Sequence, residues 1–328
     1  MTPAGTDTSS SAGKRGRPAY SVVIAAYNAA QTVGEAIDSV LAQTRQDFEV
    51  IVVDDGSSDE TCSRVAAYAG DSRVRLHRQA NAGPGAARNA GIALARGEYL
   101  CMLDSDDLWL PCYLQRMAAA LRDSPAAGFA YTDAWALEQA SGRIRRATTM
   151  SRQRPPERSL SPSEFLEALV RRNFVFNSVT IRREVLERVG GYDQALAQAE
   201  DYELWLRIAA WGYPGVRIED PLAIYRVHPD SLSQDERGLL EGLLSAYSAV
   251  IDRHPAPENV KLIARERFDA VERQLAALQG GWTLASARLR ARRILAAATR
   301  GARSRRRLLA TPPPEVAEAF PHLGDGRA

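Results

Sequence analysis

Short apolar runs alternate with helix-like segments over the first hundred residues, and this alternation restricts the fold more than any other feature of the chain. The runs are rich in β-branched residues, which is typical of strands that are buried on both faces. They lie at residues 20–27, 48–53, 74–77 and 99–103. Because amphipathic helical patterns separate them, the sequence predicts an α/β fold with a mostly parallel sheet and flanking helices.

Some of these helices carry start signals. Thr32 and Glu35 fit a capping box, in which Thr32 is the N-cap and Glu35 reaches back to its backbone. Another helix is expected to begin near Asp59. Pro84 suits the first turn of a third helix, which Gly97 closes.

After residue 110 the pattern is less regular. An exposed, basic and Pro-rich loop is expected over residues 143–163, helices are expected from Arg237 onward, and Pro312–Pro314 should open a short tail. The other expected elements are helices at 162–172 and 200–211 and strands at 179–182 and 222–227.

The composition is that of a globular protein, with 45% hydrophobic and 25% charged residues among 328. A net charge of +2 gives no argument for a nucleic-acid partner. Three scattered cysteines without a CxxC spacing indicate reduced thiols in a cytosolic protein, not a disulfide framework or a zinc site. The sequence has no apolar run long enough to span a membrane. Residues 1–18 lack the apolar core of a secretory signal and are expected to form a disordered leader.

Three polar segments follow strands of the predicted sheet. They are Tyr27-Asn28, Asp54-Asp55 and Asp104-Ser105-Asp106-Asp107. In sheets of this kind ligands bind outside the carboxyl ends of the strands, so segments that are distant in sequence would share one edge. Their convergence is stronger evidence for a binding site than any one of them.

The acidic segment at residues 104–107 has two interpretations. Carboxylates gathered at the end of a buried strand are costly unless positive charge reaches them. Cations such as Mg²⁺ bind one or two carboxylates together with the phosphate oxygens of a substrate, which fits this cluster. The alternative is a solvated acidic turn ahead of Pro111.

Asp54, Asp55 and Tyr27 are candidates for contacts with a nucleotide. The aspartates could form a turn and cap a helix, or one of them could face a base or a ribose. Tyr27 could be the last core residue of its strand or could stack on a base.

Arg88 lies in a Gly-rich helix start at residues 81–91. Together with backbone N–H groups it could meet a diphosphate, or it could be a structural ion-pair partner. A dinucleotide-binding fingerprint is excluded, because Arg88 stands where a GxGxxG motif starting at Gly83 needs glycine.

Asp201 and His228 are candidates from the second half of the chain. Glu200, Asp201 and Glu203 suit the first turn of a helix through its dipole alone, whereas one carboxylate could instead act as a general base on an acceptor hydroxyl. His228 follows a short strand and could be structural or could bind a divalent metal.

Taken in order along the chain, these segments resemble the motifs of the family 2 glycosyltransferases, which have the GT-A fold. The resemblance covers roughly Ser21 to Ser231 and rests on SVVIAAYN, EVIVVDDGSSDET, NAGPGAARNAG, GEYLCMLDSDDLWLP, GGYD, AEDYELWLR and YRVHPDS. It implies transfer of a sugar from a nucleotide diphosphate donor, expected to be a UDP-sugar, to an acceptor hydroxyl. The anomeric carbon would be inverted.

The resemblance also implies a role for each candidate residue. The segment Asp104-Ser105-Asp106 looks like the DxD motif, with Asp104 and Ser105 near the donor and Asp106 and His228 as ligands of Mn²⁺ or Mg²⁺. Asp201 resembles the catalytic base. The residues that would contact the donor nucleotide or its diphosphate are Tyr27, Asn28, Asp54, Asp55 and Arg88.

The same resemblance divides the chain. Residues 19–110 would be the nucleotide-binding half and 111–235 the acceptor half of a GT-A domain, followed by a helical Arg-rich region at 236–328. The chain lacks the QxxRW motif of processive family members, which favours single additions. The resemblance to the family alone implies a glycan or lipid-linked acceptor in cell-envelope or exopolysaccharide synthesis. A cytoplasmic enzyme is expected. The basic stretch at 288–307 is either a solvated helix or a peripheral contact with the anionic inner face of the membrane.

Two rival functions make different demands on the sequence. A nucleotidyltransferase should carry a Gly-rich loop with Arg and Lys after its first strand, where this chain has Tyr27-Asn28-Ala29-Ala30. A catalytically degenerate scaffold that only binds a nucleotide sugar should have lost its acidic set, yet Asp106 and Asp201 are both present.

Overall fold

A computed structural model describes residues 17–145, 148–150, 153, 160–228, 235–279, 309 and 311–323. Residues 1–16 of the leader expected at residues 1–18 lie outside the described residues. The basic stretch at 288–307 also lies wholly outside them.

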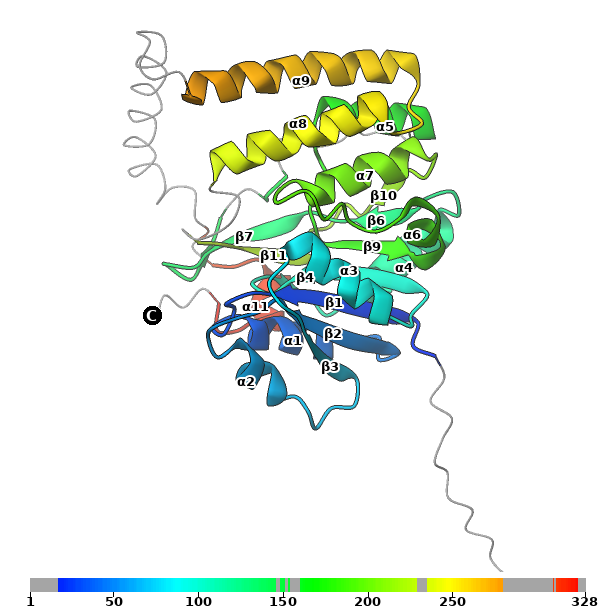
Figure 1. Cartoon of the computed structure of the whole chain (residues 1–328). Helices are drawn as coiled ribbons and strands as arrows, with labels where there is room; N and C mark the ends of the chain where they lie inside the picture. The colour runs from blue at the N-terminus through cyan, green and yellow to red at the C-terminus, as the bar shows by residue number, and fades with distance from the viewer. Residues whose placement is uncertain are drawn as a thin grey trace, which may run out of the picture.

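Within the described residues, seven strands form the main sheet (Figure 1). They are β1 (Tyr20–Ala26), β2 (Phe48–Asp54), β3 (Val74–Arg78), β4 (Tyr99–Asp104), β6 (Phe129–Tyr131), β9 (Val179–Arg182) and β10 (Gly215–Arg217). Their order is β10-β6-β9-β4-β1-β2-β3. Strand β9 is antiparallel to β4 and β6, whereas the other neighbours are parallel. The prediction of a mostly parallel sheet with flanking helices is confirmed.

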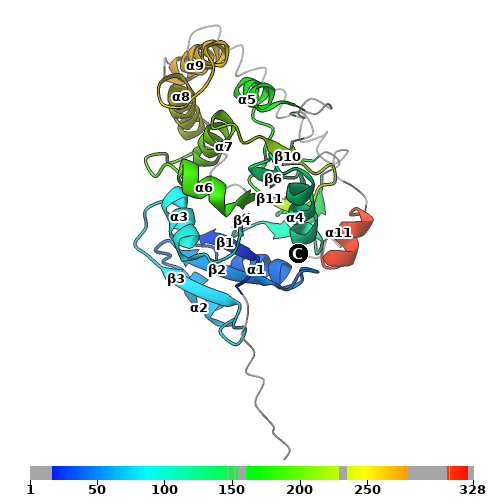
Figure 2. The same ribbon diagram turned by 90° about the vertical axis from the view of Figure 1, so that its right-hand side faces the viewer.

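Helices cover both faces of this sheet, as Figure 2 shows end on. They are α1 (Val33–Leu41), α2 (Thr61–Ala66), α3 (Pro84–Leu94), α4 (Tyr113–Asp123), α5 (Pro162–Arg171), α6 (Arg183–Val189) and α7 (Glu200–Ala210). Successive side chains of a strand point to opposite faces. Val22 and Ile24 of β1 therefore join the core under α1 and α4, whereas Val23 joins the core under α3, α5 and α7. Two covered faces explain why the strand sequences are apolar without alternation.

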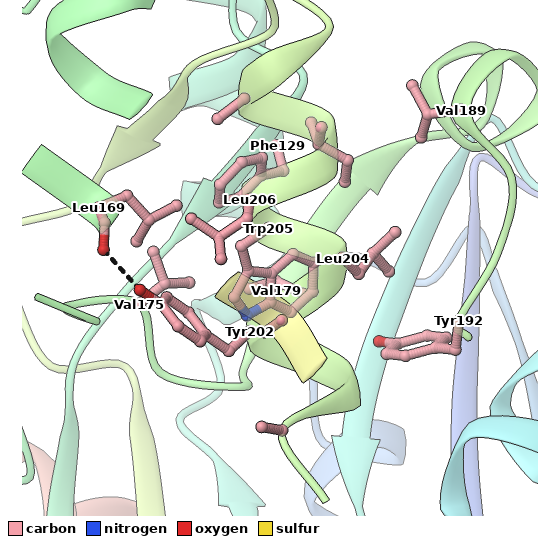
Figure 3. Close-up of a cluster of buried hydrophobic side chains, with 14 of the residues drawn as sticks. Phe129, Leu169, Val175, Val179, Val189, Tyr192, Tyr202, Leu204, Trp205 and Leu206 are labelled. Carbon is pink, nitrogen blue, oxygen red and sulfur yellow. Dashed lines mark hydrogen bonds between the residues drawn. The ribbon is translucent and has the colours of Figure 1, made fainter. Parts of the chain in front are cut away.

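The core on the α7 side is built around aromatic rings (Figure 3). Trp205 of α7 is fully buried and stacks on Phe129 of β6, with ring centroids 5.4 Å apart. Tyr202 donates a hydrogen bond from its hydroxyl to the carbonyl of Leu169 in α5 at 2.8 Å. Helix α7 is therefore held firmly along its length, and this matters because its first turn carries Asp201.

A second, smaller sheet was not predicted. In the described chain it has the order β5-β11-β7-β8, formed by β5 (Leu108–Trp109), β7 (Ala134–Glu138), β8 (Arg143–Ile144) and β11 (Ala223–Val227). Two of these strands have only two residues, too few for any periodic pattern to appear in the sequence.

The C-terminal segment returns to this small sheet. Helix α11 (Pro314–Ala319) contributes Val316 to a core with Leu108 of β5 and Ile224 of β11, and Phe320 joins it just beyond the helix. The N–H of Leu309 donates to the carbonyl of Ile144 at 2.9 Å. The residues after Pro312 thus pack against the small sheet, where the sequence had predicted a short tail.

Helices α8 (Glu236–Asp252) and α9 (Glu258–Gln279) follow the GT-A-like part and confirm the helices expected after Arg237. They pack against each other, α8 contacts α7 and α9 contacts α5 (Figure 1). Among the described residues, no helix is both long and apolar enough to cross a membrane.

The predicted capping box of α1 is wrong. Thr32 is the N-cap residue, but its side chain makes no capping hydrogen bond. Glu35 pairs instead with Arg226 of β11, with 2.6 Å between Oε2 and a guanidinium nitrogen. Water can replace a capping hydrogen bond at the half-buried Thr32, whereas the buried Arg226 needs a countercharge.

Candidate active site

The carboxyl ends of β1, β2 and β4 meet at one edge of the main sheet, as predicted. Ala26 of β1 pairs with Asp54 of β2, and Ala25 pairs with Asp104 of β4. The first turn of α7 brings Glu200 and Asp201 to the same edge, because Arg88 of α3 contacts both Asp104 and Glu200.

Arg88 is the centre of this edge. Its guanidinium lies 2.7 Å from Asp104 Oδ1 and 2.5 Å from Glu200 Oε1, with the ring of Tyr192 at 5.3 Å. The Arg88 side chain is 8% exposed, and burial acts to lower its pKa; the charges of Asp104 and Glu200 outweigh burial and hold the pKa of Arg88 above its usual range. A cation already paired with two carboxylates has little charge left for a diphosphate. The geometry therefore favours the ion-pair role of Arg88 over direct contact with the donor.

Asn177 supports Asp104 from the far side. The register of β4 and β9 pairs Met102 with Val179, so two residues further along Asn177 comes to lie opposite Asp104. Its amide nitrogen donates to both carboxylate oxygens, at 3.1 and 3.2 Å. Asp104 is thus held between Arg88 and Asn177, and the sequence pattern gave no signal for Asn177.

The segment 104–107 is held in place by β11. Arg226 donates its backbone N–H to Asp107 Oδ1 at 3.0 Å and its Nε to the carbonyl of Asp106 at 2.9 Å. Burial and then the charge of Asp106 raise the pKa of Asp107 well above its usual range. Asp107 is therefore buried and helps to hold the 104–107 segment against β11, whereas Asp106 is half-buried at the surface of the site. Ser105, between them, is half-buried too.

Asp106 and His228 lie together, as predicted for a pair of metal ligands. His228 Nε2 is 3.0 Å from Asp106 Oδ2. Burial and the charge of Asp104 raise the pKa of Asp106, although His228 acts against this. A carboxyl group with an unfavourable charge environment beside an imidazole suits a divalent cation.

In the part of the chain that the structure describes, no three His, Cys, Asp or Glu side chains converge in metal-binding geometry. Mg²⁺ commonly uses one or two carboxylates and takes its remaining ligands from substrate phosphates and water. The Asp106–His228 pair fits a cation of that kind, and does not fit one that needs a full set of protein ligands.

Asp201 has a carboxyl group whose pKa is shifted toward neutral pH. Burial raises the pKa of Asp201 to about 7, the neighbouring charge of Glu200 adds to this, and Arg88 acts in the opposite direction. A carboxyl group poised near neutral pH can accept a proton far better than one with an ordinary pKa near 4. Ala199, the N-cap residue of α7, adopts the left-handed conformation with φ of 58° and offers no side-chain cap.

The candidates at the nucleotide side differ in what they contact. Tyr27 is 54% exposed at the end of β1, so it is free to stack on a base and is not a core residue. Asn28, with φ of 50°, accepts the Ser58 N–H at its Oδ1 and donates its own N–H to Ser57 Oγ, both at 2.9 Å. Asn28 therefore clamps the turn after β2.

Asp54 and Asp55 are both buried and both engaged. Asp54 accepts hydrogen bonds from Ser57 and Cys62 and closes the turn, as in the first of the two predicted roles. Asp55 accepts the backbone N–H groups of Ala82 and Gly83 at 3.0 and 2.8 Å and so positions the segment that starts α3. A contact between either aspartate and a base stays a prediction.

Asn89 and Arg207 fix the turn before α7. Asn89 bonds both backbone groups of Tyr192, at 2.8 Å each. Arg207 donates to the carbonyls of Val189 and Gly191 at 2.8 and 2.6 Å. Asn89 belongs to the motif NAGPGAARNAG and Tyr192 to the motif GGYD. Contacts between the two motifs therefore account for part of each.

The chain matches a known family over much of its length. Residues 21–190 match the model described as glycosyl transferase family 2. The succinoglycan biosynthesis protein ExoO of Rhizobium meliloti (strain 1021) is 36% identical over 246 residues, covering 72% of this chain and 69% of that protein. The uncharacterized glycosyltransferase EpsJ of Bacillus subtilis (strain 168) is 31% identical over 229 residues, covering 66% of this chain and 63% of that protein.

Solved structures show the same fold. S. aureus TarS 1–349 in complex with UDP has a TM-score of 0.55 and 22% identity, over 76% of this chain and 70% of that one. The mannosyltransferase PcManGT of Pyrobaculum calidifontis, in complex with GDP-Man and Mn²⁺, has a TM-score of 0.59 and 22% identity, over 86% of this chain and 81% of that one. With this fold and this family match, the chain belongs to glycosyltransferase family 2 and is a glycosyltransferase with a GT-A-like fold.

Proposed function

We propose that this glycosyltransferase moves one sugar at a time from a nucleotide diphosphate sugar to an acceptor hydroxyl, with inversion at the anomeric carbon. The observation that carries the proposal is the position of Asp201. Burial raises the pKa of its carboxyl group to about 7, and the group lies at the sheet edge that also holds Asp104 and the Asp106–His228 pair.

The steps follow from these positions. Asp201 takes the proton of the acceptor hydroxyl while the acceptor oxygen attacks the anomeric carbon from the face opposite the diphosphate. The bond between that carbon and the diphosphate oxygen breaks, and the electron pair leaves with the diphosphate. A divalent cation bound by Asp106 and His228 would neutralise charge on the leaving group. Arg88 and Asn177 hold Asp104 in place for the donor.

The donor and the acceptor are proposed by chemistry and by analogy. The TarS structure contains UDP and the PcManGT structure GDP-Man, so a nucleotide sugar, with UDP-sugar as first choice, is the expected donor. The name of ExoO points to succinoglycan biosynthesis, and a growing polysaccharide on a lipid carrier is therefore the proposed acceptor. The proposed enzyme works at the cytoplasmic side of a membrane.

The first test is thermal stabilisation by UDP, GDP, dTDP and CDP, each with and without Mn²⁺. A nucleotide at about 100 times its Kd adds roughly 2.7 kcal/mol to the free energy of unfolding, which is easily seen as a higher Tm. Stabilisation by one nucleotide that depends on Mn²⁺, and that is lost in Asp106→Ala, supports the donor site and identifies the base. A folded protein that responds to no nucleotide would favour the degenerate scaffold.

The second test concerns catalysis. Release of the nucleoside diphosphate from the sugar donor is measured with membrane glycolipids as acceptors. Asp201→Asn keeps the shape of the side chain but cannot accept a proton, so turnover should fall about 10²–10⁴-fold while nucleotide binding persists. Wild-type turnover in Asp201→Asn would overturn the assignment of the base.

A further inference from the structure

We propose that Gly242 of α8 is a positioning residue for the catalytic base, because its missing side chain lets the helix backbone lie directly against the peptide that leads into α7. The inference rests on the proposed role of Asp201. It concerns a helix beyond residues 21–190, the part of the chain that matches the family model.

The contact at Gly242 is between backbones. A Cβ atom at this position would lie 2.3 Å from the carbonyl oxygen of Gln198, 2.8 Å from its carbonyl carbon and 3.1 Å from the Cβ of Ala199. Real Cβ atoms essentially never approach another heavy atom as closely as the first two distances. Any side chain at Gly242 must therefore displace the 198–199 peptide or push α8 away from it.

The displaced peptide is the one that sets the direction of Asp201. Ala199 is the N-cap of α7 and is held at φ of 58°, a conformation that costs an L-residue energy and needs support from its surroundings. The N-cap has no side-chain hydrogen bond of its own. Two residues later comes Asp201, so a shift of this peptide moves the carboxylate relative to Glu200 and Arg88.

One exposed side-chain hydrogen bond also joins the same two segments, in addition to the backbone contact at Gly242. The side-chain amide of Gln198 donates to Asp235 Oδ2 at 3.1 Å, and Asp235 caps α8 by accepting the N–H of Gly238. Helix α8 itself is anchored, because Ala246, Ala249 and Val250 are fully buried. Figure 1 shows α8 lying along α7. Helix α8 thus acts on the active site through the entry of α7.

Gly238, one turn earlier in α8, provides a matched control. A Cβ atom there would meet the Gln198 Nε2 at 2.4 Å and the Asp235 Oδ2 at 2.5 Å, which are the ends of side chains that can move. Both substitutions to alanine replace glycine by a better helix former in the same helix. They differ in whether the new methyl group meets backbone or a flexible side chain.

The experiment compares Gly242→Ala and Gly238→Ala in the full chain. We expect kcat of Gly242→Ala to fall about 10-fold to 100-fold, as for a displaced catalytic group, while the Kd of the donor nucleotide with Mn²⁺ stays within about twofold of wild type. Gly238→Ala should keep wild-type kcat, because it disturbs only the exposed Gln198–Asp235 hydrogen bond and leaves the backbone contact at Gly242 in place. A structural defect alone would lower the unfolding midpoint and weaken nucleotide binding in parallel with kcat.

Three results would overturn the inference: a wild-type kcat in a folded Gly242→Ala protein, an equal loss in Gly238→Ala, or losses of kcat and nucleotide affinity in proportion. Asp201→Asn is assayed beside them. If Asp201→Asn retains turnover, the proposed base is wrong; if it loses turnover and Gly242→Ala does not, only the role of Gly242 is wrong. Should Gly242→Ala fail to fold, the double variant with Ala199→Gly replaces it: glycine at 199 adopts positive φ without strain and removes the 3.1 Å contact, so the chain can accommodate the new methyl group, while the Gln198 carbonyl must still move away from it. The same outcomes then apply.

Discussion

Replacing Arg88 by methionine should destabilise the protein by about 3–5 kcal/mol near neutral pH, because a buried carboxylate then loses its countercharge. Arg88 bridges Glu200 and Asp104, whose side chains are 9% and 31% exposed. Asp104 keeps its hydrogen bonds from Asn177 and some contact with water, so most of the cost falls on Glu200. Methionine is long enough to fill much of the space that the arginine stem leaves.

The penalty should depend on pH with a defined sign. Without Arg88, the buried carboxylate of Glu200 has no countercharge, and burial without a countercharge disfavours the charged form in the folded state. The folded variant should therefore hold a proton that the unfolded chain has released, so stability falls as pH rises. The loss caused by Arg88→Met should therefore be smaller near pH 5 than near pH 7.5.

Urea unfolding at the two pH values measures this effect. A lower midpoint at an unchanged m-value reports a loss of stability alone. Arg171→Met is the control, since its pair with Glu167 is made by side chains that are 55% and 36% exposed. Exposed pairs one helical turn apart contribute only about 0.3–0.5 kcal/mol. Adding Glu200→Gln to Arg88→Met should restore more than half of the lost stability. A loss under about 1 kcal/mol for Arg88→Met, or an equal loss at both pH values, would refute the reasoning.

Three further predictions concern the active site. Because burial raises the pKa of Asp201 to about 7, turnover should rise with pH up to a midpoint near 7 and level off above it, and Glu200→Gln should move that midpoint to lower pH in a pH–rate profile. The same raised pKa means that Asp201 contributes stability at low pH that is lost as pH rises through 7, so Asp201→Asn should flatten the pH dependence of the unfolding midpoint there. Tyr27→Ala should leave the Tm of the free protein unchanged, since the ring is 54% exposed, but should weaken nucleotide binding in a titration by about 1–3 kcal/mol if the ring stacks on the base; an unchanged Kd would remove Tyr27 from the site.

The main sheet could be predicted from the sequence because its strands are buried on both faces. The runs at β1, β2 and β4 are continuous and apolar, and the helices between them are amphipathic. Both patterns therefore predict the same alternation of buried strands and flanking helices. The small sheet could not be predicted in this way. Its β5 and β8 have two residues each and are strands only through their partners in space.

The arrangement of the candidate site could be predicted in part, for a related physical reason. Residues that end a strand or begin a helix, such as Asp104 and Asp201, can be placed from the hydrophobic pattern of that strand or helix. Asn177 does not, because it meets Asp104 only through the antiparallel register of β4 and β9. Arg226 likewise holds the segment at Asp106 and Asp107 from a strand more than a hundred residues later. No local signal marks either residue.

The place of β11 in the small sheet shows that the folding unit extends past the end of the family model. The family match ends at residue 190, yet β11 lies between β5 and β7, which belong to the matched part. A fragment that stops at 190 would leave those two strands without the one that joins them and would expose Leu108 and the rest of their shared core. Recombination at residue 190, where the family model ends, should therefore yield insoluble chimaeras, whereas a junction beyond α11 would keep the small sheet whole.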